Sequence, residues 1–327
     1  MTQLAPLRFR SHPLIRGGHL QTLATTFFHS PELESSTQRH QVCLGDGDQL
    51  VMHDDCPPGW SAAQPRLLMI HGLCGSHRTS YMARLATRFY QRQVRVFRLD
   101  MRGCGAGFEL AQHLNHASRS GDILRAAEKV VELTGAGPFW IIGISLGAGQ
   151  LLKLLGELAQ GQLPSSSHVQ IHRAAAVAPP IDLLGCAQHM QRLYMRPYNR
   201  YFISYLLKQI PPQLAQSSAF QQLDLRRRPR TMYELDDRIT APLSGYQSAQ
   251  DYYTRSTADQ FTAGIETETL VLAAQDDPIV PVGGFKRAEW SPSTTLEIVP
   301  GGGHVAFLAS GRPRFWMDQR LEHWFFS

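Results

Sequence analysis

The sequence lacks the features that mark membrane-spanning, disulfide-rich and zinc-binding proteins. No window approaches about 18 uninterrupted apolar residues, the length that a membrane-spanning helix needs. The segment MTQLAPLRFRSHPLIRGG has no apolar core of the kind found in secretory signals. The five cysteines are odd in number, widely spaced and never arranged as Cys-x-x-Cys. We therefore expect no integral membrane segment, no disulfide framework, no metal and a cytoplasmic location, while a peripheral contact with lipid remains compatible with this composition.

Charge is also sparse, at 18% of residues against 43% hydrophobic residues, which favours a globular protein with a large core. The net charge is +5, and the basic residues are scattered apart from Arg226, Arg227, Arg228 and Arg230. No base-reading motif accompanies this cluster, so we expect no nucleic-acid partner. We interpret the cluster as a solvated face or a rim that attracts phosphate.

What the sequence does contain is a regular alternation of strand-like and helix-like segments. A hairpin turn at Gly45–Asp48 separates two extended runs, and the alternation begins after it. The pattern predicts one α/β domain over 1–327, with a mostly parallel sheet covered by helices on both faces. Strands are predicted at 67–70, 94–99, 139–144, 174–178, 269–274 and 295–299, and helices at 79–93, 120–133, 146–158 and 314–326.

The alternation is interrupted between about 182 and 250, where tyrosine, arginine and methionine interleave without strand-like runs. We interpret this stretch as a helical cap inserted over the carboxyl edge of the sheet. Its aromatic residues would then line an apolar acyl pocket, with Tyr194, Tyr198, Tyr201 and Phe202 as its walls. The alternative is a set of helices packed on the sheet with no role in binding.

The most informative short motif is Gly143-x-Ser145-x-Gly147, between the apolar run FWIIGI and the helical run LGAGQLLKLLGEL. A sharp strand-to-helix turn of this kind lifts a serine hydroxyl above the sheet and needs small neighbours. Ser145 is therefore a candidate nucleophile. The plainer interpretation is a tight connection that tolerates any small residue.

A serine nucleophile needs a base and a group that orients the base. QDDPIVP and GGGHVAFL each follow a predicted strand, which places Asp277 and His304 at the same sheet edge as Ser145. The order serine, acid, histidine is that of α/β hydrolases. Asp276 is the competing acid, and Asp182 is a weaker candidate.

An acyl-transfer site also needs hydrogen-bond donors for the oxyanion of the tetrahedral intermediate. His71-Gly72-Leu73 follows a predicted strand, and Leu146 follows the serine, so the backbone N–H groups of Leu73 and Leu146 are the candidates. His71 then has a structural role, and Cys74 is a small filler of the loop.

Two further motifs invite other interpretations. The segment RGCGAG (102–107) lacks the glycine spacing of a dinucleotide-binding turn, and we interpret it as a loop on the pocket floor. His113 and His116 have no carboxylate partner in a defined helix, so they do not indicate a metal site. We expect no cofactor.

Together these segments resemble the AB-hydrolase-4 branch of the α/β hydrolases, which includes YheT-like bacterial hydrolases and ABHD1/ABHD3-type lipid hydrolases. The matching pieces are GGHLQTL (17–23), HGLCGS (71–76), RGCGAG, GISLGAG (143–149), ELDDRITAPLSGY (234–246), DYY (251–253), QDDPIVP and GGGHVAFL. The resemblance implies an α/β-hydrolase fold, a Ser145–His304–Asp277 triad, no metal, and hydrolysis of acyl esters. RGCGAG departs from the family by having Ala106 and Gly107 where relatives are more polar.

The sequence therefore predicts a serine hydrolase that cleaves a small carboxylic ester through an acyl-enzyme. A thioesterase or amidase would use the same three residues. A ligand-binding protein on the same scaffold, without catalysis, is the alternative from another class.

Overall fold

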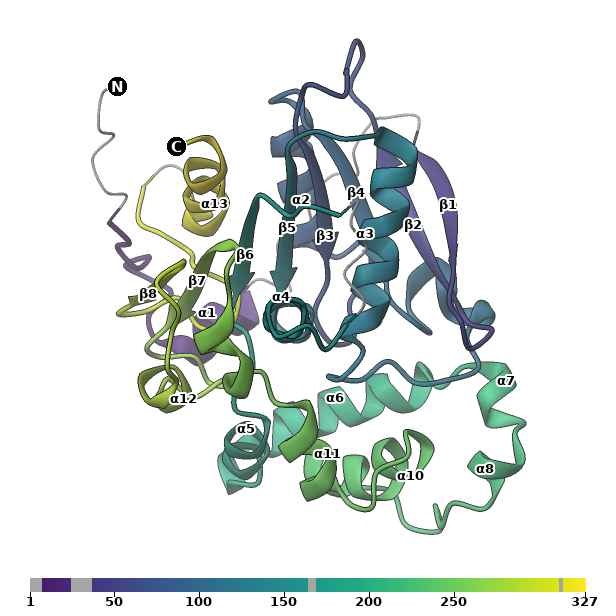
Figure 1. The fold of residues 1–327 in the computed structure, drawn as a ribbon. Coiled ribbons are helices and arrows are strands. Elements are labelled where there is room, and N and C mark those ends of the chain that lie inside the picture. Colours follow the sequence, from purple (N-terminus) through teal and green to yellow (C-terminus); the bar gives the residue numbers. More distant parts are fainter. Residues whose placement is uncertain (1–7, 25–36, 164–168, 312–313) are drawn as a thin grey trace.

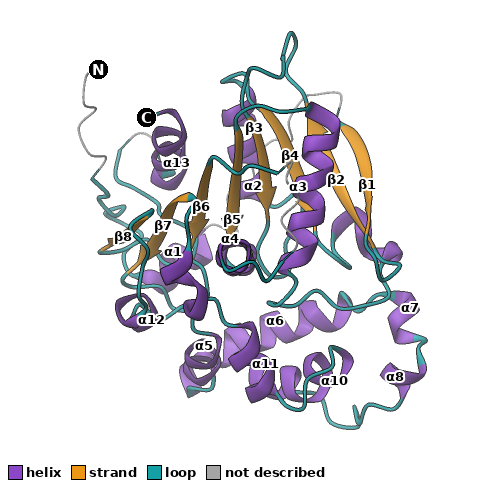
Figure 2. Ribbon diagram, in the orientation of Figure 1, coloured by secondary structure: helices purple, strands orange, loops and turns teal. Residues whose placement is uncertain are grey.

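A single eight-stranded sheet crosses the molecule (Figures 1 and 2) in the order β1-β2-β4-β3-β5-β6-β7-β8. The computed structural model describes residues 8–24, 37–163, 169–311 and 314–327. β2 runs antiparallel to β1 and β4, and every other neighbouring pair is parallel. The strands are Gln38–Cys43, Gln49–Asp55, Arg66–Ile70, Arg95–Asp100, Phe139–Ile144, Arg173–Val177, Glu268–Ala274 and Thr294–Val299, from β1 to β8.

The central strands β3 and β5 are buried on both faces because, apart from Arg66 at the start of β3, they contain no polar side chain. All five residues of β3 and all six of β5 are buried. Leu68 and Ile70 face one hydrophobic cluster, whereas Leu67 and Met69 face the other, as the two-residue repeat of a strand requires. The edge strand β1, QRHQVC, is polar and mostly exposed.

Helices cover the sheet on both faces (Figure 2), as the alternation predicted. The clusters place α3 (Ser120–Thr134) and α4 (Leu146–Ala159) on one face, and α2 (Ser80–Tyr90) and α13 (Trp316–Phe326) on the other. α2 is shorter than the predicted 79–93, and Gln93 adopts a positive φ of 61° beyond its end. None of the described helices is both long and apolar enough to cross a membrane.

Between β6 and β7 the chain forms helices and turns only, and those of residues 183–256 lie beyond the carboxyl ends of the parallel strands (Figure 1). The last of them, a 3₁₀ helix at Asp259–Gly264, packs against α4 instead. A 3₁₀ turn, Leu193–Met195, precedes α6, and a π-helical turn, Asp236–Thr240, follows α9. The α-helices of this segment are α5 (Leu183–Met190), α6 (Arg196–Lys208), α7 (Pro212–Ala215), α8 (Ser218–Gln221), α9 (Met232–Leu235), α10 (Ala241–Leu243) and α11 (Ala249–Ser256).

The sheet order also fixes where loops gather. β3 and β5 are neighbours in the sheet, but the helix that follows β3, α2, lies on one face and the helix that follows β5, α4, lies on the other. Loops at the carboxyl ends of strands separate at such a point and leave room for a ligand. The loops after β3 and β5 begin there.

Candidate active site

Ser145 occupies the turn between β5 and α4 in a strained conformation, with φ 53° and ψ −119°. Its backbone N–H donates to the carbonyl of Val177 at 2.8 Å. The turn is too tight for side chains on either side. A Cβ at Gly143 would lie 2.6 Å from the Gly147 oxygen, and one at Gly147 would lie 2.6 Å from the His71 oxygen. The Gly-x-Ser-x-Gly spacing is therefore a steric requirement of this turn.

His304 follows β8 and faces Ser145. The serine Oγ lies 2.8 Å from the His304 Nε2. The loop that carries the histidine turns through Gly302 and Gly303, whose φ angles are 128° and 57°. Its backbone is anchored by the His304 N–H, which donates to the Thr22 Oγ1 at 2.8 Å.

Asp277 lies behind the histidine. Its Oδ2 is 2.8 Å from the His304 Nδ1, and its Oδ1 accepts the backbone N–H groups of Ile279 and Val280 at 2.8 and 2.9 Å. The carboxylate is thus fixed with one oxygen free for the imidazole. With Nδ1–H donated to Asp277, Nε2 can accept the proton of Ser145.

The two competing acids have other partners. Asp276 Oδ1 accepts the backbone N–H of Gly303 at 2.9 Å, so it stabilises the histidine loop. Asp182 caps α5 by accepting the Gly185 N–H at 2.7 Å and pairs with Arg287 at 2.6 Å. Of the three, Asp277 contacts the imidazole.

The loop after β3 passes beside the serine. A Cβ at Gly72 would lie 2.9 Å from the Ser145 Cβ. Leu73 and Leu146 border the same cavity as the serine. Leu146 is the first residue of α4, so its N–H has no acceptor within the helix.

Neighbouring residues of this loop have structural contacts. His71 is fully buried, shares its Nδ1–H with the Gly72 oxygen at 2.7 Å, and accepts the Met101 N–H on Nε2 at 3.2 Å. Burial lowers the pKa of His71. Burial also raises the pKa of the Cys74 thiol to about 12, which disfavours the thiolate that a nucleophile would need.

A cavity of about 770 Å³ extends from the serine into the helical segment. Ser145 and His304 border it. Tyr194 from the 3₁₀ turn and Tyr198, Tyr201 and Phe202 from α6 also lie on its wall, as do the apolar side chains of Leu206, Leu207, Ile210, Leu235 and Ile239. Arg102, Gly103 and Cys104 border it too, and the rest of RGCGAG continues into a 3₁₀ helix, Gly105–Leu110.

Sequence reasoning assigned no role to α1 (Gly18–Ala24), which joins the acid loop to the histidine loop. Thr22 accepts the His304 N–H, and a Cβ at Gly18 would lie 1.7 Å from the Asp276 oxygen. The buried Gln21 side chain donates to the oxygens of Ile15 and Leu308 at 2.9 and 3.0 Å and accepts the Leu308 N–H at 2.8 Å. The motif GGHLQTL, which covers most of α1, was the feature of the sequence that could have pointed to this role.

Two motifs of the helical segment meet beside the cavity. Asp236, from ELDDRITAPLSGY, accepts the hydroxyl of Tyr253, from DYY, at 2.7 Å and that of Thr240 at 2.7 Å. Asp237 accepts the Ala249 N–H at 2.9 Å. Burial raises the pKa of Asp236 to about 6. These acids therefore hold α11 against the π-helical turn.

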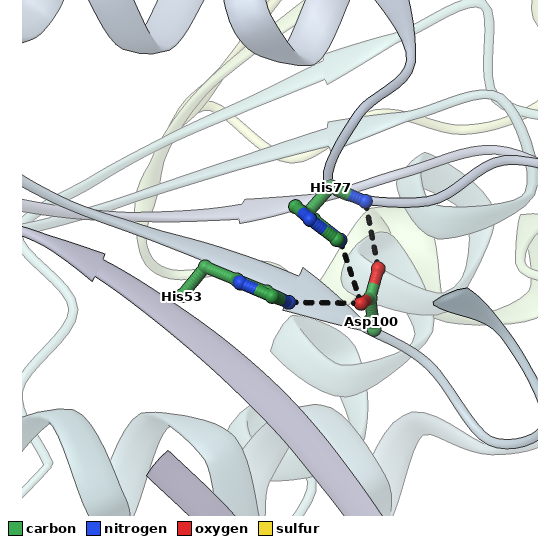
Figure 3. Close-up of side chains that lie close together, drawn as sticks. All are labelled: His53, His77 and Asp100. Atoms are coloured by element: carbon green, nitrogen blue, oxygen red, sulfur yellow. Dashed lines mark hydrogen bonds and ion pairs between the residues drawn. The ribbon is translucent and has the colours of Figure 1, made fainter. Parts of the chain in front are cut away.

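Among the described residues, one buried group that could hold a metal consists of His53, His77 and Asp100 (Figure 3). Both imidazoles donate to the Asp100 Oδ2, His53 through Nε2 at 2.9 Å and His77 through Nδ1 at 2.7 Å. The rings stack with centroids 3.4 Å apart. The Asp100 carboxylate also accepts the backbone N–H groups of His77 and Ala106, at 2.7 and 2.9 Å. The ligand atoms of this group are therefore engaged in hydrogen bonds with one another and with the backbone, and the geometry is that of a hydrogen-bonded cluster.

The other group in the described ranges consists of Asp46, Asp48 and His113. Asp48 is fully buried and pairs with Arg102, and it accepts the N–H groups of Gln112 and His113 at 2.7 and 3.2 Å. Both carboxylate oxygens of Asp48 are thus engaged, by the arginine and by these two backbone N–H groups.

A sequence model of the α/β hydrolase fold matches residues 65–310. The chain belongs to the α/β hydrolase fold family. Solved structures agree on the fold. A 2,6-dihydroxy-pseudo-oxynicotine hydrolase superposes with a TM-score of 0.57 at 16% identity, covering 94% of this chain and 71% of its own. An esterase of Pyrococcus furiosus gives a TM-score of 0.57 at 12% identity, covering 90% and 95%. The predicted fold is confirmed.

Relatives of this α/β hydrolase confirm the narrower resemblance as well. It is 26% identical to YheT of Escherichia coli (strain K12), over 94% of this chain and 89% of that protein. It is 28% identical to a monoacylglycerol lipase of Saccharomyces cerevisiae, over 89% and 64%, and 23% identical to the human phospholipase ABHD3, over 91% and 73%. The chain thus spans less than two thirds of the yeast lipase.

Proposed function

We propose that this carboxylic ester hydrolase cleaves acyl esters through an acyl-enzyme formed on Ser145. The Ser145 Oγ attacks the ester carbonyl while the His304 Nε2 takes its proton. Asp277 stabilises the imidazolium and holds its tautomer. The N–H groups of Leu73 and Leu146 donate to the oxyanion. The imidazolium then protonates the leaving alcohol.

Water completes the cycle on the same residues. His304 takes a proton from water as the water oxygen attacks the acyl carbonyl, and the second tetrahedral intermediate collapses. The Ser145 oxygen leaves with the proton from His304, and the acid is released. The helices between β6 and β7 act as a cap whose apolar wall holds the acyl chain.

The observation that carries this proposal is the chain of hydrogen bonds through His304. Its Nε2 lies 2.8 Å from the Ser145 Oγ, and its Nδ1 lies 2.8 Å from the Asp277 Oδ2. The printed names of the yeast and human relatives, a monoacylglycerol lipase and a phospholipase, support an ester as the substrate.

A fluorophosphonate probe and a chain-length series of chromogenic esters test the proposal. We expect the wild type to be labelled and to hydrolyse the esters, and Ser145→Ala to do neither. Cys74→Ala is the matched control, because it changes another small residue on the cavity wall and should keep its labelling. Absence of labelling in the wild type, or equal labelling of Ser145→Ala, would refute the proposal. Faster cleavage of matched thioesters or amides would reassign the substrate bond.

A further inference from the structure

Large apolar side chains are exposed on one side of the cavity. They come from α1 and from the stretch formed by the 3₁₀ turn and α6, and their exposed fractions range from 44% to 72%. We call this set the aromatic rim. It consists of Leu20, Leu23, Leu193, Tyr194, Tyr201 and Tyr205.

The aromatic rim is continuous across the two elements. The His19 Nδ1 of α1 lies 3.1 Å from the Tyr198 hydroxyl of α6, and its ring contacts the Tyr194 ring. The Tyr201 and Tyr205 rings are in contact, with centroids 5.0 Å apart and planes tilted by 43°. Leu23, Tyr194 and Tyr201 are half exposed and also border the cavity, so the cavity reaches the surface within the rim.

The chain segment that carries four of the six rim residues is basic and contains no acid. From 183 to 223 the sequence contains neither aspartate nor glutamate. Exposed cations of this stretch are Arg192, Arg196, Arg200 and Lys208. Arg228 donates to the Ser204 hydroxyl of α6 at 2.7 Å, which brings the arginine cluster at 226–230 beside the same helix. The two acids that flank this stretch are each paired with an arginine, Asp182 with Arg287 and Asp224 with Arg226.

We propose that the aromatic rim and its basic border dock this protein on the surface of an anionic lipid bilayer. Tyrosine and leucine side chains enter the region between headgroups and acyl chains, while arginine and lysine heads contact lipid phosphates. The exposed apolar patch complements the acyl-chain region of the bilayer, and the positive charge beside it complements the anionic headgroups. An uncharged partner would match only the apolar patch.

The inference rests on the proposed function, which it deepens by stating how the substrate arrives. A docked molecule has its cavity opening against the bilayer. An ester of a lipid can then move from the membrane to Ser145 without crossing water. The cap wall that holds the acyl chain is continuous with the rim through Tyr194 and Tyr201.

Vesicle co-sedimentation of the full chain tests the docking separately from catalysis. The Ser145→Ala variant is used so that lipid is not consumed, with vesicles of phosphatidylcholine alone and of equimolar phosphatidylcholine and phosphatidylglycerol. We expect binding to the anionic vesicles, weakening with added salt, and little binding to the neutral ones. A failed fluorophosphonate test would remove the proposed function and leave this binding unaffected.

Two variants remove one component each without changing the cavity wall. Leu20→Ser/Leu193→Ser/Tyr205→Ser removes apolar area and should abolish sedimentation with vesicles. Arg200→Gln removes one cation and should weaken binding about fivefold, the effect of about one basic residue at an anionic surface. Arg39→Gln is the matched control, since Arg39 is exposed on the edge strand β1, and it should change binding less than about twofold.

Both variants should hydrolyse a dissolved ester at the wild-type rate when Ser145 is restored. Absence of vesicle binding, equal binding to neutral and anionic vesicles, or equal loss in Arg39→Gln and Arg200→Gln would overturn the proposal. A change of oligomeric state in the triple variant, with no vesicle binding by the parent, would reassign the rim to contact between copies of this chain.

Discussion

Thr22→Val removes the hydroxyl that anchors the proposed catalytic histidine, without changing the volume of the side chain. Thr22 Oγ1 accepts the His304 N–H at 2.8 Å and donates to the Gly18 oxygen at 2.7 Å. Valine can make neither bond. The His304 backbone then loses a fixed point in a loop where Gly303, Val305 and Phe307 all have positive φ angles.

The expected effect follows from the lost acceptor. A backbone N–H left without a partner costs about 1 to 3 kcal/mol. If the loop recovers that energy by moving away from its productive position, the barrier to catalysis rises by the same amount, which lowers kcat about 5- to 150-fold. KM should change less than kcat, because the apolar wall formed by α6 is not altered by the substitution.

Steady-state kinetics on a chromogenic ester and thermal unfolding of the same samples measure the two effects. Thr22→Ser keeps the hydroxyl and should retain most of kcat. Thr134→Val is the control for stability, because it deletes a buried hydroxyl that donates to the Val130 oxygen at 2.7 Å, far along the chain in α3. A Thr22→Val variant that lowers only the melting temperature, or a Thr22→Ser variant that loses as much kcat as Thr22→Val, would refute this role of the Thr22 hydroxyl.

The remaining predictions concern three aspartates. Asp277→Asn should lower kcat about ten-thousand-fold by favouring the wrong tautomer of His304, whereas Asp276→Asn should cost less than about tenfold because an amide oxygen still accepts the Gly303 N–H; similar losses in both would contradict the assignment. For Asp236, burial raises the pKa to about 6, so the folded protein keeps a proton that the unfolded chain releases at lower pH. This contribution is present at low pH and is lost as pH rises through about 6. Asp236→Asn should therefore be more favourable at pH 8 than at pH 4 by up to about 3 kcal/mol in urea unfolding, and an equal effect at both pH values would exclude this linkage.

The sequence predicted most of the fold because local patterns decide where strands and helices form. β5 matches its predicted range, and the five other strands that were given a range differ from prediction by one residue at one or both ends. Their apolar runs need helices on both faces of the sheet for burial. The helical connections between parallel strands supply those helices, so the sequence favours a parallel sheet. The ends of helices were less predictable. α13 begins at Trp316 rather than at 314, since tertiary contacts decide where a helix frays.

The candidate site was predictable only where it depends on strand order. Parallel strands bring the loops that follow them to one edge of the sheet, so the sequence alone could place Ser145, Asp277 and His304 together. Strand order could not decide between Asp276 and Asp277. Adjacent residues lie at the same edge of the sheet, and only the directions of their side chains distinguish them. The Thr22–His304 contact spans 282 residues and comes from an N-terminal helix, about which strand order says nothing.

Backbone strain shows why such distant anchors are needed at this edge. Among the described residues, six other than glycine have positive φ angles, and five of them follow the carboxyl ends of β3, β5, β6 and β8: Cys74, Ser145, Ala178, Val305 and Phe307. Each such residue costs on the order of 1 to 3 kcal/mol and persists only where its surroundings fix it. The Ser145 N–H is fixed by Val177, and the histidine loop is fixed by Thr22, Gln21 and Asp276. The strained residues therefore lie in the loops that bring Ser145, Asp277 and His304 into contact. The helix α1 stabilises the histidine loop, although it lies outside the segment matched by the family model.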